Sequence, residues 1–102
     1  MTTDWMATLK AAGILVAKTE ADTLKLLQNE QLDMSQAVRL LDAVNELSDQ
    51  FDDVIAEMYA DEGVDEELLE AAVSIEELWS ELCMRCVDKV RLLQQAIEQS
   101  QR

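Results

Sequence analysis

Proline is absent from this sequence of 102 residues, and glycine occurs only twice, at Gly13 and Gly63. Proline and glycine most often end helices and form turns, so their scarcity favours long, uninterrupted helices. The apolar residues support this prediction, because they recur at intervals of three and four positions, which places them on one face of a helix. We therefore expect an all-α protein whose residues 1–102 form a single domain.

Histidine is also absent, and the only cysteines, Cys83 and Cys86, lie three residues apart. A closed zinc site takes four ligands, and helical di-metal sites take histidine from Glu-x-x-His motifs, so neither kind of site is expected. A redox-active Cys-x-x-Cys pair needs a helix N-terminus, whereas this pair falls inside a predicted helix. Packing of both side chains is the favoured interpretation, and a four-thiolate site shared by two chains is the alternative.

Recognisable catalytic parts are missing as well. The sequence has no Gly-rich phosphate loop and no nucleophile with a base beside it. The acidic segment 61–65 resembles a calcium loop in composition, but Gly63 would then place the first ligand on Met58, which excludes an EF-hand. We expect that the protein is not an enzyme and that it has no catalytic residue, no cofactor and no metal.

Basic residues are few. The sequence contains eight Lys and Arg residues and 22 Asp and Glu residues, which gives a formal net charge of -14. Such a charge repels phosphate backbones and anionic lipid surfaces, so neither nucleic acid nor a membrane is expected as a direct partner. The longest apolar run, Ala11 to Ala17, is shorter than the roughly 20 residues of a spanning helix. Asp4 stands where a signal peptide would carry Lys or Arg, so the predicted location is the cytoplasm.

Three long helices are predicted, at about residues 4–30, 34–60 and 66–99. Thr3 or Asp4 can accept hydrogen bonds from the first turn of the first helix. The connections between the helices are short, and short connections force neighbouring helices to be antiparallel. The expected fold is therefore an elongated up-down-up bundle of three long antiparallel helices.

The other helix boundaries carry their own signals. Asp33 followed by Gln36 is a capping-box pattern at the start of the second helix. Gly63 can adopt the left-handed conformation after the end of that helix, and Asp65 can cap the start of the third.

The first predicted helix has an unusually broad apolar face. Its apolar residues cover about 200° or more of the circumference, against about 140° on the second helix. Either this helix is central and covered on two sides, or part of the face binds another protein. The residues predicted to form a partner or dimer interface, on helices one and three, are Trp5, Leu9, Ala12, Ile14, Leu15, Val16, Leu26, Leu69, Val73 and Val87.

Glu20 interrupts the broad apolar face of the first helix, because helical spacing points it toward Leu9 and Val16. A lone buried carboxylate is costly. The absence of Gly and Pro nearby favours a continuous helix in which Glu20 meets a basic residue on another helix. The alternative is a break after Lys18, with Thr19 as the cap of a new helix.

The acidic residues are concentrated in one block. Between Arg39 and Arg85 there are fifteen Asp or Glu residues and no Lys or Arg. Apolar residues recur through this block at helical spacing, so the charge belongs to a folded surface and not to a disordered tail. The carboxylates predicted to form this acidic surface are Asp42, Glu46, Asp49, Asp53, Glu57, Glu66, Glu70, Glu77 and Glu81.

These features predict a small acidic helical module that binds and masks the surface of another protein, such as a transcription regulator or a secreted protein, and that forms a homodimer. Anti-activators and chaperones both belong to this class. Two alternatives remain open: a nucleic-acid mimic, whose carboxylates replace phosphates on a DNA- or RNA-binding protein, and a purely structural subunit. Mimicry depends on charge and should weaken steeply as salt rises, whereas an apolar contact should respond little.

Overall fold

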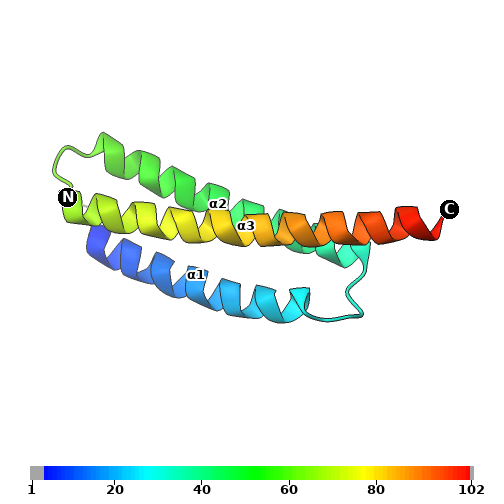
Figure 1. The fold of residues 1–102 in the computed structure, drawn as a ribbon. Coiled ribbons are helices and arrows are strands. Elements are labelled where there is room, and N and C mark those ends of the chain that lie inside the picture. The colour runs from blue at the N-terminus through cyan, green and yellow to red at the C-terminus, as the bar shows by residue number, and fades with distance from the viewer. Residues whose placement is uncertain (1–3, 102) are drawn as a thin grey trace.

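The computed structural model describes residues 4–101 and confirms the all-α bundle. It contains three helices, α1 (Trp5–Leu27), α2 (Met34–Ala60) and α3 (Glu66–Ser100) (Figure 1). Over residues 4–101 there is no β-strand. The molecule measures 60 × 21 × 19 Å, so the predicted elongation is also confirmed. The first helix ends at Leu27, earlier than the predicted boundary near residue 30.

Two of the predicted caps are present. The Asp4 carboxylate accepts a hydrogen bond of 3.1 Å from the backbone N–H of Ala7, at the start of α1. At the start of α2, Asp33 accepts a bond of 2.8 Å from the backbone N–H of Gln36, and the Gln36 side chain accepts one of 3.1 Å from the backbone N–H of Asp33. Thr3, the other candidate for the first cap, lies outside the described residues. Local side-chain chemistry therefore fixes where α1 and α2 begin.

The connection from α2 to α3 differs from the prediction. Within residues 4–101 no glycine has a positive φ, so Gly63 is not left-handed. Instead, Asp61 leaves α2 in an extended conformation, and its carboxylate accepts a bond of 3.0 Å from the backbone N–H of Gly63. Asp65 is the N-terminal cap residue of α3, but its side chain accepts no capping hydrogen bond. The aspartate side chain thus makes the turn that a left-handed glycine would otherwise make.

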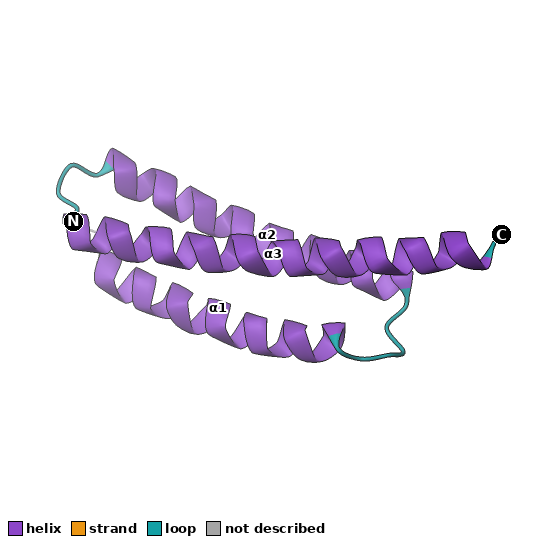
Figure 2. Cartoon of the chain, in the orientation of Figure 1, coloured by secondary structure: helices purple, strands orange, loops and turns teal. Residues whose placement is uncertain are grey.

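Helix α3 lies between the other two helices (Figure 2). Helices α1 and α2 each pack mainly against α3 and make few contacts with each other. The alternative in which the first helix is central is therefore wrong, and α3 takes that place. Its C-terminal turns extend past the connection between α1 and α2 (Figure 1).

The buried core runs along the inner faces of all three helices. The largest side chains that are almost fully buried are Trp79, Met58, Leu82, Val16, Val44 and Cys86. Four residues of α1 are buried: Trp5, Leu9, Val16 and Thr23. They are spaced by four and seven positions, which is one narrow line on a helix, so α1 buries only part of its broad apolar face.

Helix α1 is continuous through Glu20, as the favoured interpretation predicted. Glu20 is half-buried and not enclosed in the core, and within residues 4–101 it forms no ion pair, so the expected contact with a basic residue on another helix is absent. Its carboxylate therefore remains near water, and the cost that the sequence suggested is relieved without a break in the helix.

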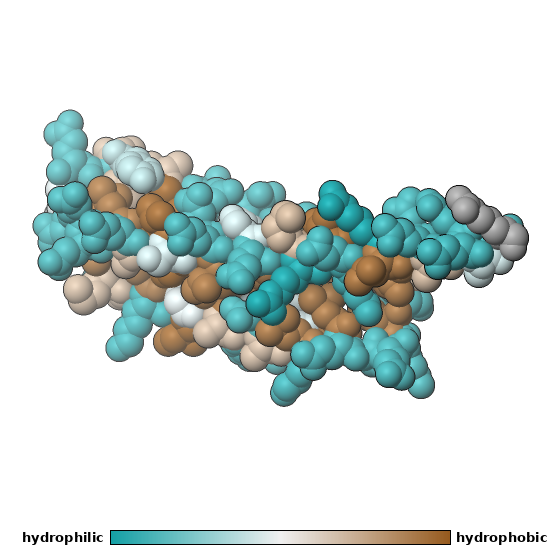
Figure 3. Space-filling model, viewed as in Figure 1, coloured by the Kyte–Doolittle hydropathy of each residue, from teal (hydrophilic) through white to brown (hydrophobic). Residues whose placement is uncertain are grey.

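The surface mixes apolar and polar side chains. On the face shown in Figure 3, hydrophobic residues lie among hydrophilic ones along the bundle, and the two ends are mainly hydrophilic. None of the helices built by residues 4–101 has the length and apolar character needed to cross a bilayer.

Candidate functional site

Three of the predicted interface residues belong to the core. Trp5, Leu9 and Val16 are buried within a single chain, so they offer no surface to a partner and the prediction is wrong for them. They belong to the core that the three helices share. An apolar helix face does not reveal from sequence which of its residues a neighbouring helix will cover.

Other predicted residues of α1 do reach the surface. Ile14 is 64% exposed, Leu26 is 46% exposed and Leu15 is 45% exposed. Ala12 is half-buried. Isolated exposed apolar residues are common on proteins, but several on one helix are characteristic of an interaction surface.

The predicted residues of α3 lie elsewhere. Leu69 and Val87 are half-buried and Val73 is exposed. Leu69 and Val73 line a shallow depression with Tyr59 of α2. This depression does not include any residue of α1, so the structure divides the predicted interface between two surfaces.

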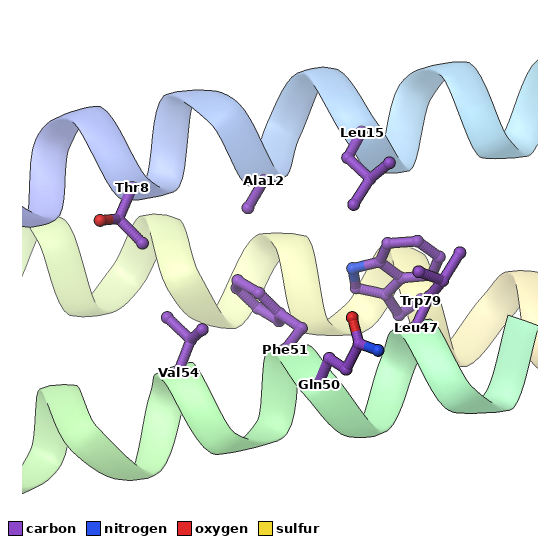
Figure 4. A pocket seen from close by; sticks show the side chains of 8 residues that line it. All are labelled: Thr8, Ala12, Leu15, Leu47, Gln50, Phe51, Val54 and Trp79. Atoms are coloured by element: carbon purple, nitrogen blue, oxygen red, sulfur yellow. The ribbon is translucent and has the colours of Figure 1, made fainter.

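An apolar groove lies between α1 and α2, with α3 as its floor (Figure 4). Its volume is about 180 Å³. The lining residues are Thr8, Ala12 and Leu15 of α1, Leu47, Gln50, Phe51 and Val54 of α2, and Trp79 of α3. In Figure 4 the side chains of α1 and α2 point toward each other across this space, with the indole of Trp79 between them. The groove exists because α1 and α2 both pack on α3 and leave each other largely free.

A second depression of about 340 Å³ lies between the same two helices, near their connection. Its lining residues are Leu26, Asn29, Leu32, Gln36, Arg39 and Leu40. On α1 the two depressions span Thr8 to Leu26, a distance of about 27 Å at the standard helical rise. The side of the bundle where α1 faces α2 is therefore open near both of its ends.

Trp79 brings an unsatisfied polar group to this groove. The residue is only 1% exposed, and its indole Nε1–H finds no hydrogen-bond acceptor within residues 4–101. A buried donor without an acceptor costs about 1–3 kcal/mol. Trp5 provides a contrast, because its Nε1–H donates a bond of 2.7 Å to the Asp61 carboxylate. This missing acceptor could not be predicted from the sequence.

Carboxylates flank the α2 side of the groove. Glu46, Asp53 and Glu57 are exposed, and their spacing of seven and four residues puts them on the same face of α2 as Gln50, which lines the groove. We refer to these three residues as the acidic lip. None of these three carboxylates forms an ion pair within residues 4–101. The one ion pair among the described residues joins Arg85 to Glu81 at 3.6 Å.

All nine carboxylates of the predicted acidic surface are exposed. Those of α2 and those of α3 nevertheless lie on different helices, each set facing outward by helical spacing. The acidic surface is therefore divided between two outer faces of the bundle.

The two cysteines lie away from the groove. Cys86 is buried, Cys83 is half-buried and both thiols are free. Burial raises the pKa of each thiol above its ordinary value, and nearby Asp49 and Asp52 contribute to the increase at Cys83. Both groups are therefore poor nucleophiles at neutral pH.

Within residues 4–101, no three His, Cys, Asp or Glu side chains lie close enough together to hold a metal ion. The groove offers a mainly apolar lining with a few polar groups, and such a lining suits binding of an apolar side chain. No protein-family model, no curated protein and no solved structure matches this chain.

Proposed function

We propose that this protein is a small acidic interaction module that binds and masks the surface of another protein through the groove between α1 and α2. The observation that carries the proposal is the groove itself, an apolar hollow floored by a buried tryptophan and bordered by the exposed Leu15. Interface anchors are usually apolar or aromatic side chains that fill such pockets.

The class of function remains the one that the sequence suggests. An anti-activator would occupy a surface that a transcription regulator needs, and a chaperone would cover apolar helices of a secreted protein. In both cases the exposed carboxylates increase the rate of association with basic partners and repel acidic ones.

Charge mimicry is the second candidate, because so few of the carboxylates are paired. In this alternative the outer faces of α2 and α3 would replace the phosphates of a nucleic acid on a DNA- or RNA-binding protein. The groove is favoured over this alternative because it supplies an apolar pocket for an interface anchor, which mimicry of phosphate charge would not require.

Two substitutions of the same kind test the docking site. Leu15→Glu places a charge in the groove, and Leu78→Glu places one on α3 at a residue of similar exposure, 40%, that does not line the groove. Partners captured from source cells by the wild type would be identified by mass spectrometry, and their affinities then measured with each purified variant. We expect Leu15→Glu to weaken binding at least 30-fold, since loss of an interface anchor costs more than about 2 kcal/mol.

The mimic predicts the reverse order. Asp42→Lys, Asp49→Lys and Asp53→Lys, introduced together, should slow association and weaken binding less than Leu15→Glu does if the groove is the site. If this triple variant loses the partner while a folded Leu15→Glu protein retains it, the docking function is wrong and mimicry replaces it. Circular dichroism on each variant would establish that the helices are intact.

A further inference from the structure

We propose that the groove between α1 and α2 receives an amphipathic helix of a partner protein whose polar flank is basic and whose buried face carries one hydrogen-bond acceptor. This inference rests on the proposed docking function and adds the chemistry of the partner. Four observations support it: the length of the open side of the bundle, the charge of its lip, the unsatisfied indole of Trp79, and the charge of the chain as a whole.

The shape of the site favours a helix. The two depressions lie within a span of about 27 Å along α1, which a helix of roughly 18 residues would cover from end to end. At the groove, α1 and α2 flank the space and α3 forms its floor, so an added helix would complete a four-helix arrangement there. Apolar side chains at intervals of three and four residues would enter the groove beside Leu15 and Phe51.

The lip indicates the charge of the occupant. Glu46, Asp53 and Glu57 stand on the outer edge of the groove without a basic partner in the described chain. A helix in the groove would place its own flanking residues opposite these carboxylates. Lys or Arg at those positions would gain attraction at the rim, and Asp or Glu would be repelled.

Trp79 indicates a polar atom within the otherwise apolar face of the occupant. Its Nε1–H has no acceptor, and its ring stands in the groove between α1 and α2 (Figure 4). A Gln, Asn, Ser or Thr side chain that entered the groove beside the indole could accept this bond. An aliphatic residue at the same position would leave the donor unsatisfied.

A second copy of this chain fits less well. It would bring another net charge of -14 to the acidic lip. The C-terminal part of α3, with Lys89, Arg91 and the exposed Leu92, is one segment of the chain that has the basic and apolar residues the groove requires. Self-occupancy through that segment is therefore one of the outcomes that the experiment distinguishes.

The experiment is a selection from a displayed library of 18-residue helical peptides on the full-length protein, with both charged and apolar positions randomised. We expect enriched peptides to be basic and to carry one Gln, Asn, Ser or Thr within an apolar face. Their affinity should fall at least tenfold on Leu15→Glu and remain unchanged on Leu78→Glu.

Neutralisation of the lip supplies the matched charge control. The set Glu46→Gln, Asp53→Asn and Glu57→Gln should weaken the selected peptides about tenfold. The set Glu70→Gln, Glu77→Gln and Glu81→Gln removes the same charge from the outer face of α3 and should have a much smaller effect. With Trp79→Phe, a selected peptide and its variant with an apolar residue in place of the Gln, Asn, Ser or Thr should bind with equal affinity.

Each contrary result has its own meaning. Enriched helices that are neutral or acidic but still depend on Leu15 would overturn the basic occupant and leave the docking function standing. Peptides that bind Leu15→Glu and Leu78→Glu equally well would overturn both proposals. A dimer that Leu15→Glu converts to a monomer would show that a second copy fills the groove, and a library without any groove-dependent helix would also overturn the inference.

Discussion

Cys83 and Cys86 illustrate how one motif acquires its meaning from its position. A Cys-x-x-Cys pair near a helix N-terminus has a lowered thiol pKa, but this pair lies inside α3, where burial raises both pKa values. The side chains therefore act as small apolar groups in the packing of α3, and slow alkylation by iodoacetamide is expected at neutral pH.

Replacement of both cysteines by Ala tests this role. The variant should lose about 1–3 kcal/mol of unfolding free energy, because each substitution removes a packed sulfur atom. Urea unfolding would measure the loss, with Met84→Ala as a control on the same helix, since Met84 is exposed. Partner binding should be unchanged. A folded double variant that no longer binds would contradict the packing interpretation.

Asp61 joins the start of α1 to the turn between α2 and α3, because its carboxylate accepts hydrogen bonds from Trp5 and Gly63. Its pKa lies below its ordinary value of 3.8, first because Trp5 Nε1–H donates to the carboxylate and then because the backbone N–H of Gly63 does so. A lowered folded-state pKa stabilises the protein above the ordinary pKa, and this contribution is lost as the pH falls through the folded-state pKa.

Asp61→Asn should reveal this dependence. The variant retains an acceptor for Trp5 but carries no charge, so the wild type should be the more stable protein at neutral pH. The difference in unfolding free energy should shrink below about pH 4, as the carboxylate of the wild type is protonated. Urea unfolding at several pH values would measure it. Two parallel curves between about pH 5 and 2 would contradict the proposed contribution of Asp61.

At the scale of the helices, Asp33 and Asp65 form a natural pair for comparison. Both are N-terminal cap residues, but only Asp33 accepts a capping hydrogen bond. Asp33→Ala should cost about 0.5–2 kcal/mol. Asp65→Ala should cost less, because it removes only the attraction between the carboxylate and the helix dipole. Thermal unfolding of the two variants would measure the difference, and equal losses would contradict it.

The parts of the fold that depend on residues adjacent in sequence could be predicted from the sequence. The capping box of Asp33 and Gln36 is complete within four residues, so the start of α2 was predicted correctly. The peripheral position of α1 in the bundle was not predicted, because its broad apolar face is compatible with a central or a peripheral helix. The choice depends on how all three helices share the core. The unsatisfied indole of Trp79 depends on the same distant packing and carries no local signal.

For the whole molecule, elongation and charge act together. The radius of gyration is 16.8 Å, whereas about 13 Å is typical of a compact domain of this length. A rod exposes more surface per residue, so more of the 22 acidic residues can lie in water. The same shape also leaves apolar residues such as Met6 and Ile14 exposed.

We therefore expect self-association through the outer face of α1. Light scattering at micromolar concentration should give about twice the chain mass of 11.5 kDa, and Ile14→Glu should give a monomer. Added salt should strengthen the dimer, because it screens the repulsion between two acidic chains, and should weaken binding of a basic partner. A wild-type monomer at all salt concentrations would contradict this prediction.

The length of α3 has a consequence for its dynamics. Residues 94–100 are helical but all exposed, and they extend past the connection between the other helices. A helical segment of this size without tertiary contacts is marginally stable in water. Its amide protons should therefore exchange with deuterium far faster than those around Trp79, and protection should decrease steadily toward Ser100.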